Sequence, residues 1–132
     1  MTVAATLQTI HDGARNLVVK AHLSGDGTDA SEVQLIDASA YSAPVPGVGA
    51  SLKLMKVEYA LDQFAVTLSW DASSNVEFLT LPPGSDTLDF TDIGGLINNA
   101  GSGITGDIDF STVGNATGED GFIVLHMRKR AV

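Results

Sequence analysis

The stretch Phe64-Ala65-Val66-Thr67-Leu68-Ser69-Trp70 alternates large apolar residues with small or polar ones. Successive side chains of a β-strand point to opposite faces of the sheet. A period of two therefore predicts a strand that turns one face toward a hydrophobic core. Trp70 shares the apolar phase, so we expect it in the core and not on a sugar-binding surface.

The same alternation recurs at residues 17–23 and 123–127. In the segment 52–61 the apolar phase shifts by one residue, which predicts a β-bulge. Gly- and Pro-rich turns such as Pro82-Pro83-Gly84-Ser85 separate these runs. We expect further strands at 3–9, 32–37, 76–81, 87–90 and 107–112, and one short helical turn at 93–99.

These patterns predict an all-β chain with a single domain over residues 1–132. The expected architecture is a β-sandwich or a jelly-roll-like fold of about eight to nine short strands joined by Gly/Pro-rich loops. For residues 1–10 two alternatives stay open, an N-terminal arm that adds a strand to a neighbour and the first strand of the sandwich itself.

The charge is strongly acidic and unevenly placed. The chain has 7 Lys and Arg residues against 16 Asp and Glu residues, for a formal net charge of -9. No Lys or Arg interrupts residues 57–127, and the chain then closes with Arg128-Lys129-Arg130. This balance argues against nucleic acid or an anionic membrane as a partner. Two interpretations remain, a solvated acidic surface and an acidic outer face whose basic ends bind a negative partner surface.

The sequence holds no recognisable catalytic or metal-binding constellation. There is no cysteine, and the three histidines lie in separate segments without a zinc-ligand spacing. Asp107 and Asp109 would share a strand face, where we expect a solvated pair instead of acid–base chemistry. The acidic loop 26–32 lacks the ligand spacing of a calcium loop. We therefore expect no enzyme activity, no cofactor and no metal.

The chain shows no sign of a membrane or export signal. Its first residues have neither a positively charged region nor a long apolar run, so we expect no secretory signal. No run of 18 apolar residues occurs that would predict a membrane-spanning helix.

Three segments in order carry a resemblance to a known class of protein. They are Asp12-Gly13-Ala14-Arg15-Asn16-Leu17-Val18-Val19-Lys20, then Val66-Thr67-Leu68-Ser69-Trp70-Asp71-Ala72 after Val57-Glu58-Tyr59, and Thr105-Gly106-Asp107-Ile108-Asp109-Phe110-Ser111-Thr112 before the final Arg128-Lys129. In this order the chain resembles small virion structural proteins of tailed bacteriophages that decorate or cement the outside of the capsid.

The resemblance implies a compact, non-catalytic β-protein on the capsid surface of the virion, made in the host cytoplasm. Its partners would be the major capsid protein and further copies of itself, often as a trimer, with neither nucleic acid nor membrane involved. The candidate contact residues to the capsid or to other copies are Arg15, Lys20, Arg128, Lys129 and Arg130. Two alternatives stay open, another virion component (a tail, baseplate or head–tail joining subunit) and a calcium-dependent ligand-binding β-sandwich.

Overall fold

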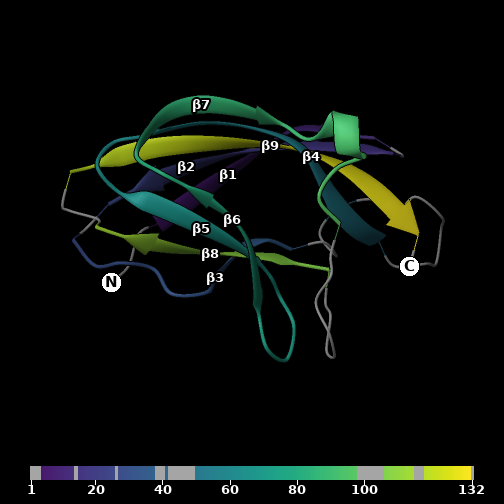
Figure 1. Cartoon of the computed structure of the whole chain (residues 1–132). Helices are drawn as coiled ribbons and strands as arrows, with labels where there is room; N and C mark the ends of the chain where they lie inside the picture. Colours follow the sequence, from purple (N-terminus) through teal and green to yellow (C-terminus); the bar gives the residue numbers. More distant parts are fainter. Residues whose placement is uncertain are drawn as a thin grey trace.

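The computed structural model describes residues 4–13, 15–25, 27–37, 41, 50–97, 106–114 and 118–131. In these residues the chain forms nine β-strands and one short 3₁₀ helix (Figure 1). The elements in chain order are β1 (Ala4–Asp12), β2 (Asn16–Ser24), β3 (Val33–Ile36), β4 (Ala50–Leu61), β5 (Ala65–Trp70), β6 (Val76–Leu81), β7 (Gly84–Asp89), η2 (Thr91–Ile93), β8 (Ile108–Val113) and β9 (Asp120–Ala131).

The strands form two antiparallel sheets that pack face to face as a β-sandwich (Figure 1). Sheet A has five strands in the order β1-β2-β9-β4-β7, and sheet B has four in the order β3-β8-β5-β6. The predicted all-β sandwich is thereby confirmed. Within sheet A, β9 lies between β2 and β4, so the last described strand joins the two halves of that sheet.

The core lies between the two sheets and follows the predicted alternation. On β5, Val66, Leu68 and Trp70 are fully buried, and Phe64 just before the strand is buried with them. Trp70 also stacks on Phe78 of β6, with ring centroids 4.0 Å apart and planes 15° from parallel. Burial of each such large apolar side chain stabilises the fold by about 1.5–3 kcal/mol. The prediction that Trp70 belongs to the core is confirmed.

A β-bulge corrects the phase of β4, as predicted from the shift in its apolar residues. The register between β4 and β9 changes between Leu54 and Lys56, which leaves Met55 as the extra residue. With this one-residue insertion, Leu54 before the bulge and Val57 after it both point into the core and are fully buried.

Residues 4–10 belong to a strand that pairs within the chain. They form part of β1, which pairs antiparallel with β2 from Ala4 to Asp12 and lies at one edge of sheet A. Residues 1–3 lie outside the described part of the chain. Of the two alternatives for the N-terminal segment, the structure shows the first strand of the sandwich itself.

The short helical turn expected at residues 93–99 lies earlier, so that only Ile93 belongs to both and residues 94–97 are not helical. The 3₁₀ helix spans Thr91–Ile93 and ends at Gly94, whose φ of 81° is in the left-handed region that glycine adopts without strain. Both the backbone N–H and the hydroxyl of Thr91 donate to the Asp89 carboxylate, at 2.9 and 2.7 Å. This Asp–Thr turn starts the helix directly after β7, and residues 98 and 99 of the expected turn lie outside the described residues.

A buried lysine ties the end of β9 to the β1–β2 turn. Lys129 continues the inward phase of β9, and its side chain is fully buried. Its ammonium forms an ion pair with Asp12 and donates to the carbonyl of Gly13 at 2.7 Å, while its backbone N–H donates to the carbonyl of Arg15 at 2.6 Å. Lys129 is among the residues expected to contact a partner, but in this structure its ammonium is buried and paired inside the molecule.

None of the described residues forms a helix with the length and apolar content needed to cross a lipid bilayer.

The Lys129–Asp12 pair predicts an asymmetry between two substitutions. Asp12→Ala is expected to lower the free energy of unfolding by about 3 kcal/mol, because it leaves a buried ammonium without its counter-ion. Lys129→Met removes the buried charge but keeps an unbranched apolar chain, so its cost is expected to be only about 1 kcal/mol. Urea denaturation at neutral pH measures both values. An equal or larger loss for Lys129→Met would contradict this account of the pair.

Candidate functional site

The basic residues are confined to one of the two sheets. All seven Lys and Arg residues lie in sheet A or in the turn between its strands β1 and β2. The strands of sheet B contain none, and they carry Glu77 and Asp109 instead. The basic positions are Arg15 in the turn, Lys20 on β2, Lys53 and Lys56 on β4, and Arg128, Lys129 and Arg130 on β9.

Most of these cations lie on the face of sheet A that points away from the core. Val18 lies opposite His126, Lys20 opposite Val124 and His22 opposite Phe122, so these side chains share one face. We call this surface the outer face of sheet A. Its residues with described side chains on the three central strands are Asn16, Val18, Lys20, His22, Ser24, Lys53, Lys56, Glu58, Ala60, Asp120, Phe122, Val124, His126 and Arg128.

An aromatic ring lies on this face near the start of β9. Phe122 on β9 is 37% exposed, and the Lys20 ammonium lies 5.4 Å from the centre of its ring. This distance is within the range of a cation–π contact. The half-buried Val18 and Val124 lie next to this pair, so the outer face combines cations with apolar contact area.

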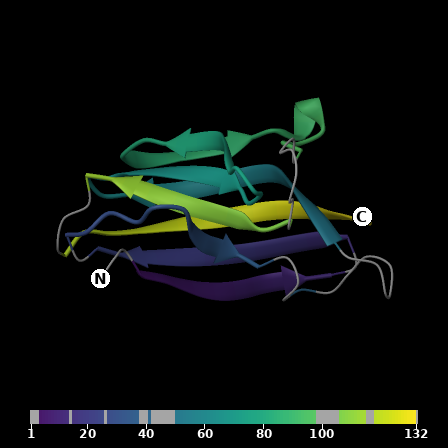
Figure 2. The same cartoon turned by 90° about the horizontal axis from the view of Figure 1, so that it is seen from below.

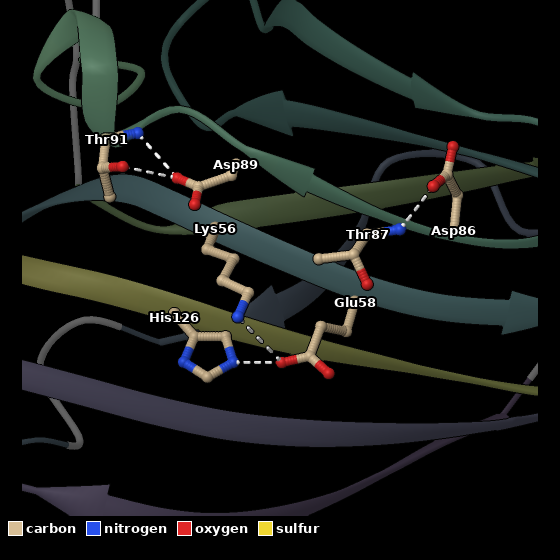
Figure 3. Close-up of polar contacts among 7 residues, drawn as sticks. All are labelled: Lys56, Glu58, Asp86, Thr87, Asp89, Thr91 and His126. Carbon is tan, nitrogen blue, oxygen red and sulfur yellow. Dashed lines mark hydrogen bonds and ion pairs between the residues drawn. The ribbon is translucent and has the colours of Figure 1, made fainter.

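A cluster of polar side chains joins β4 to β9 (Figure 3). The His126 Nε2 lies 2.9 Å from the Glu58 Oε1, and the Lys56 ammonium lies 3.7 Å from the same oxygen (Figure 3). Glu58 therefore sits between two basic groups. His126 and Glu58 are 68 positions apart in the sequence, and no local pattern predicts that they meet.

The neighbouring edge of the sheet is acidic. On β7, the backbone N–H of Thr87 donates to Asp86 at 2.7 Å, and Asp89 accepts two hydrogen bonds from Thr91 (Figure 3). The hydroxyl hydrogen bond from Thr91, followed by its backbone hydrogen bond, lowers the pKa of Asp89 below the usual range. These carboxylates are held in place by local backbone geometry and border the basic outer face on one side.

A shallow groove lies on the outer face toward the end of the sandwich where β9 begins. Its two adjoining parts have volumes of about 440 and 340 Å³ and share Ala60, Ser85 and Phe122 in their lining. Gly121 also lines the larger part, and a Cβ atom added there would lie 2.9 Å from the carbonyl oxygen of Ala60. Glycine is thus required at this position for β9 and β4 to approach each other closely. The lining also includes His22, Asp62 and Asp120.

The three histidines come to the same face of sheet A, although the sequence placed them in separate segments. His22 and His126 point outward on β2 and β9, and His11 lies opposite Val18 in the β1–β2 register. They lie on three different strands, with Val18 between His11 and His126 in one cross-strand row and His22 in another row. Among the described residues, no group of three or more His, Cys, Asp or Glu side chains is placed to hold a metal ion.

Sheet B carries a compact acidic cluster on its own outer face. The Asn75 side-chain amide donates to Asp109 at 2.8 Å, and Gln34 donates to Asp107 at 2.9 Å. Asp109 is only 5% exposed, so the expectation of a solvated pair is wrong for this residue. Burial of the carboxyl raises the pKa of Asp109 to about 6. The hydrogen bond from Asn75 lowers this pKa, while the neighbouring Asp71 and Asp107 raise it further.

The acidic loop before β3 closes onto β8 through its own side chains. Asp29 accepts hydrogen bonds from the Thr112 hydroxyl at 3.1 Å and from the Gly114 N–H at 3.2 Å. The Ala30 N–H donates in turn to the Thr112 hydroxyl at 2.9 Å. This carboxylate therefore shapes the loop, while residue 26 lies outside the described residues.

The predicted contact residues fall into distinct places. Lys20 and Arg128 lie on the outer face of sheet A, and Arg15 is exposed in the β1–β2 turn. Lys129 is buried, and of Arg130 only its place in β9 is described. The predicted contact residues do not include Lys53 and Lys56, although the alternation within β4 is the signal that places these two on the same face.

The raised pKa of Asp109 predicts a pH-dependent stability. The folded protein holds this proton more tightly than the unfolded chain, so the free energy of unfolding is expected to fall as the pH rises from about 4 to about 7. Asp109→Asn keeps an amide oxygen for Asn75 and removes the titration. The variant is expected to be more stable than the wild type by about 1–2 kcal/mol at pH 8 and to match it near pH 4.

Denaturant unfolding across this pH range measures the difference. The exposed Glu77→Gln on the same sheet serves as a matched control and is expected to leave the pH profile unchanged. Parallel pH profiles for the wild type and Asp109→Asn would contradict the prediction.

Comparison with known proteins adds little to this description. No protein-family model matches the sequence, and no curated protein matches it either. Among solved structures, the chain is similar to a cupin domain from Bordetella pertussis Tohama I, with 12% identity over 99% of this chain and 98% of that one. The TM-score is 0.37, so this likeness carries no argument about the function of the chain.

Proposed function

We propose that this chain is a non-catalytic structural protein of a tailed-bacteriophage virion that binds the outside of the assembled head. In this role it would stabilise the shell by bridging neighbouring copies of the major capsid protein. The proposal builds on the resemblance of three ordered segments to head decoration proteins. The observation that supports it is the confinement of every Lys and Arg to sheet A and the turn between its strands β1 and β2.

This charge distribution gives a net-acidic protein one side suited to a negative protein surface. Lys20, Lys53 and Arg128 would face the shell from the outer face of sheet A, and sheet B would face solvent. Arginine and lysine pair with carboxylates through charge-assisted hydrogen bonds. The exposed ring of Phe122 adds apolar contact area, as in the centre of many protein interfaces.

The mechanism is thermodynamic linkage and involves no chemistry. A protein that binds the assembled shell and not its separate subunits shifts the equilibrium toward the assembled state. A homo-oligomer would strengthen the effect, because each further copy binds at a high local concentration once the first is in place.

The location of the protein in intact particles tests the proposal directly. Electron microscopy of virions that contain this chain is expected to show repeated copies on the outer surface of the head. Particles without the protein are expected to lose heat or salt resistance. If the protein is found only in the tail or in a head–tail ring, the proposed role is wrong.

A binding measurement tests which face is used. The double variant Lys53→Ser/Arg128→Ser is expected to bind heads at least about tenfold more weakly at low salt, with a smaller difference at high salt. Glu77→Ser, on the opposite face of the sandwich, is the matched control and is expected to bind normally. Equal loss in both variants, or none in either, would exclude sheet A as the binding face.

A further inference from the structure

Strand β1 forms an open edge of sheet A. It pairs with β2 along one side, and no described strand pairs with its other side. Figure 2 shows β1 at the margin of the molecule, beyond the neighbouring strand of sheet B. A free strand edge presents unpaired N–H and C=O groups, which are a template for another strand.

The other three sheet edges carry features that discourage such pairing. β7 bears Asp86 and Asp89 and follows two prolines, and β3 is only four residues long with a shift in its register. β6 bears Glu77 and has a register shift as well. Charges, short length, bulges and prolines are the usual means by which edge strands avoid association.

The β1 edge has none of these features over most of its length. Residues 4–10 read Ala-Ala-Thr-Leu-Gln-Thr-Ile and contain no charge and no proline. The ladder with β2 is regular from Ala4 to Thr9, and the register shift comes only after it, before His11. On a protein with a net charge of -9, this neutral stretch is a place where a second copy meets little repulsion.

β1 also leaves an apolar side chain on its core-facing side partly uncovered by the described residues. Leu7 lies opposite Ala21 and so has the core-facing phase of sheet A, yet it is 42% exposed. Sheet B has one strand fewer than sheet A, so the core-facing side of β1 extends past it. Ile10 at the bulge is 55% exposed. Tyr41 hydrogen-bonds Thr9, two residues along the strand from Leu7 on the same face.

From these observations we infer that the β1 edge pairs antiparallel with the β1 edge of a second copy around a twofold axis at Leu7. In this register Leu7 lies opposite Leu7 of the second copy, Thr6 opposite Gln8 and Ala5 opposite Thr9. No like charges oppose each other, the polar Thr6 and Gln8 meet, and the two exposed leucines bury each other. The same edge serves both copies, as a twofold interface requires.

The pairing would produce a continuous ten-stranded sheet from two copies of sheet A. Opposed residues of an antiparallel pair point to the same face, so both outer faces would lie on one side of the dimer. The inference does not depend on the proposed capsid role, because it rests on the edge alone. If the capsid role holds, the dimer presents two basic faces to the shell at once.

Sedimentation velocity over about a hundredfold range of protein concentration tests for the dimer. We expect the dimer fraction to rise with concentration, because a single pair of strands forms a small interface. Leu7→Lys puts two ammonium groups opposite each other and is expected to weaken the dimer at least about tenfold. Ile93→Lys is the matched control, since Ile93 is an aliphatic residue 71% exposed on η2. It is expected to dimerise like the wild type.

Disulfide cross-linking tests the register, and does so even if Leu7→Lys folds poorly. The chain has no cysteine, so Leu7→Cys places one thiol at the twofold axis of the proposed dimer. Opposed residues of an antiparallel pair are close enough for a disulfide. Mild oxidation is expected to link Leu7→Cys into dimers much faster than Ile93→Cys. A monomeric or trimeric wild type, an unaffected Leu7→Lys or equal cross-linking rates would overturn the inference.

Discussion

Each residue of a strand must point either into the sandwich or away from it, and the rest of this structure depends on that constraint. Val66, Leu68 and Trp70 point inward and build the core, while the alternating residues of β5 point to the other side of sheet B. On β4 the constraint is kept only because a bulge at Met55 restores the phase. The same rule separates two adjacent basic residues: Arg128 points to the outer face of sheet A, and Lys129 points to the core side.

The sequence predicts the strands well because their periodicity is local. The alternation in residues 64–70 and the phase shift in 52–61 each lie within one segment, and the structure confirms both. Strand order is not local: no pattern shows that β9 lies between β2 and β4. The same limit applies to the candidate site, where His126 meets Glu58 and Asn75 meets Asp109 only through tertiary pairing.

The alternation of apolar and polar residues also fails to predict how deeply two charged side chains are buried. Asp109 lies on the solvent side of sheet B, yet Asn75 and the acidic neighbours around it leave little of it exposed. Lys129 lies on the core side of sheet A, where a charge is costly unless it is paired. In both cases the alternation gives the direction of the side chain correctly. What surrounds the side chain depends on segments that are distant in the sequence.

The position of β9 also bears on how quickly the molecule reaches its native state. The ion pair between Lys129 and Asp12 joins residues 117 positions apart, and β9 must find both β2 and β4 before sheet A is complete. Closing such long loops costs chain entropy before any strand pairing compensates for it. Two-state proteins dominated by such distant pairings fold in about milliseconds to seconds, far more slowly than helical bundles of the same stability. Until β9 docks, the edges of β2 and β4 remain open to other chains.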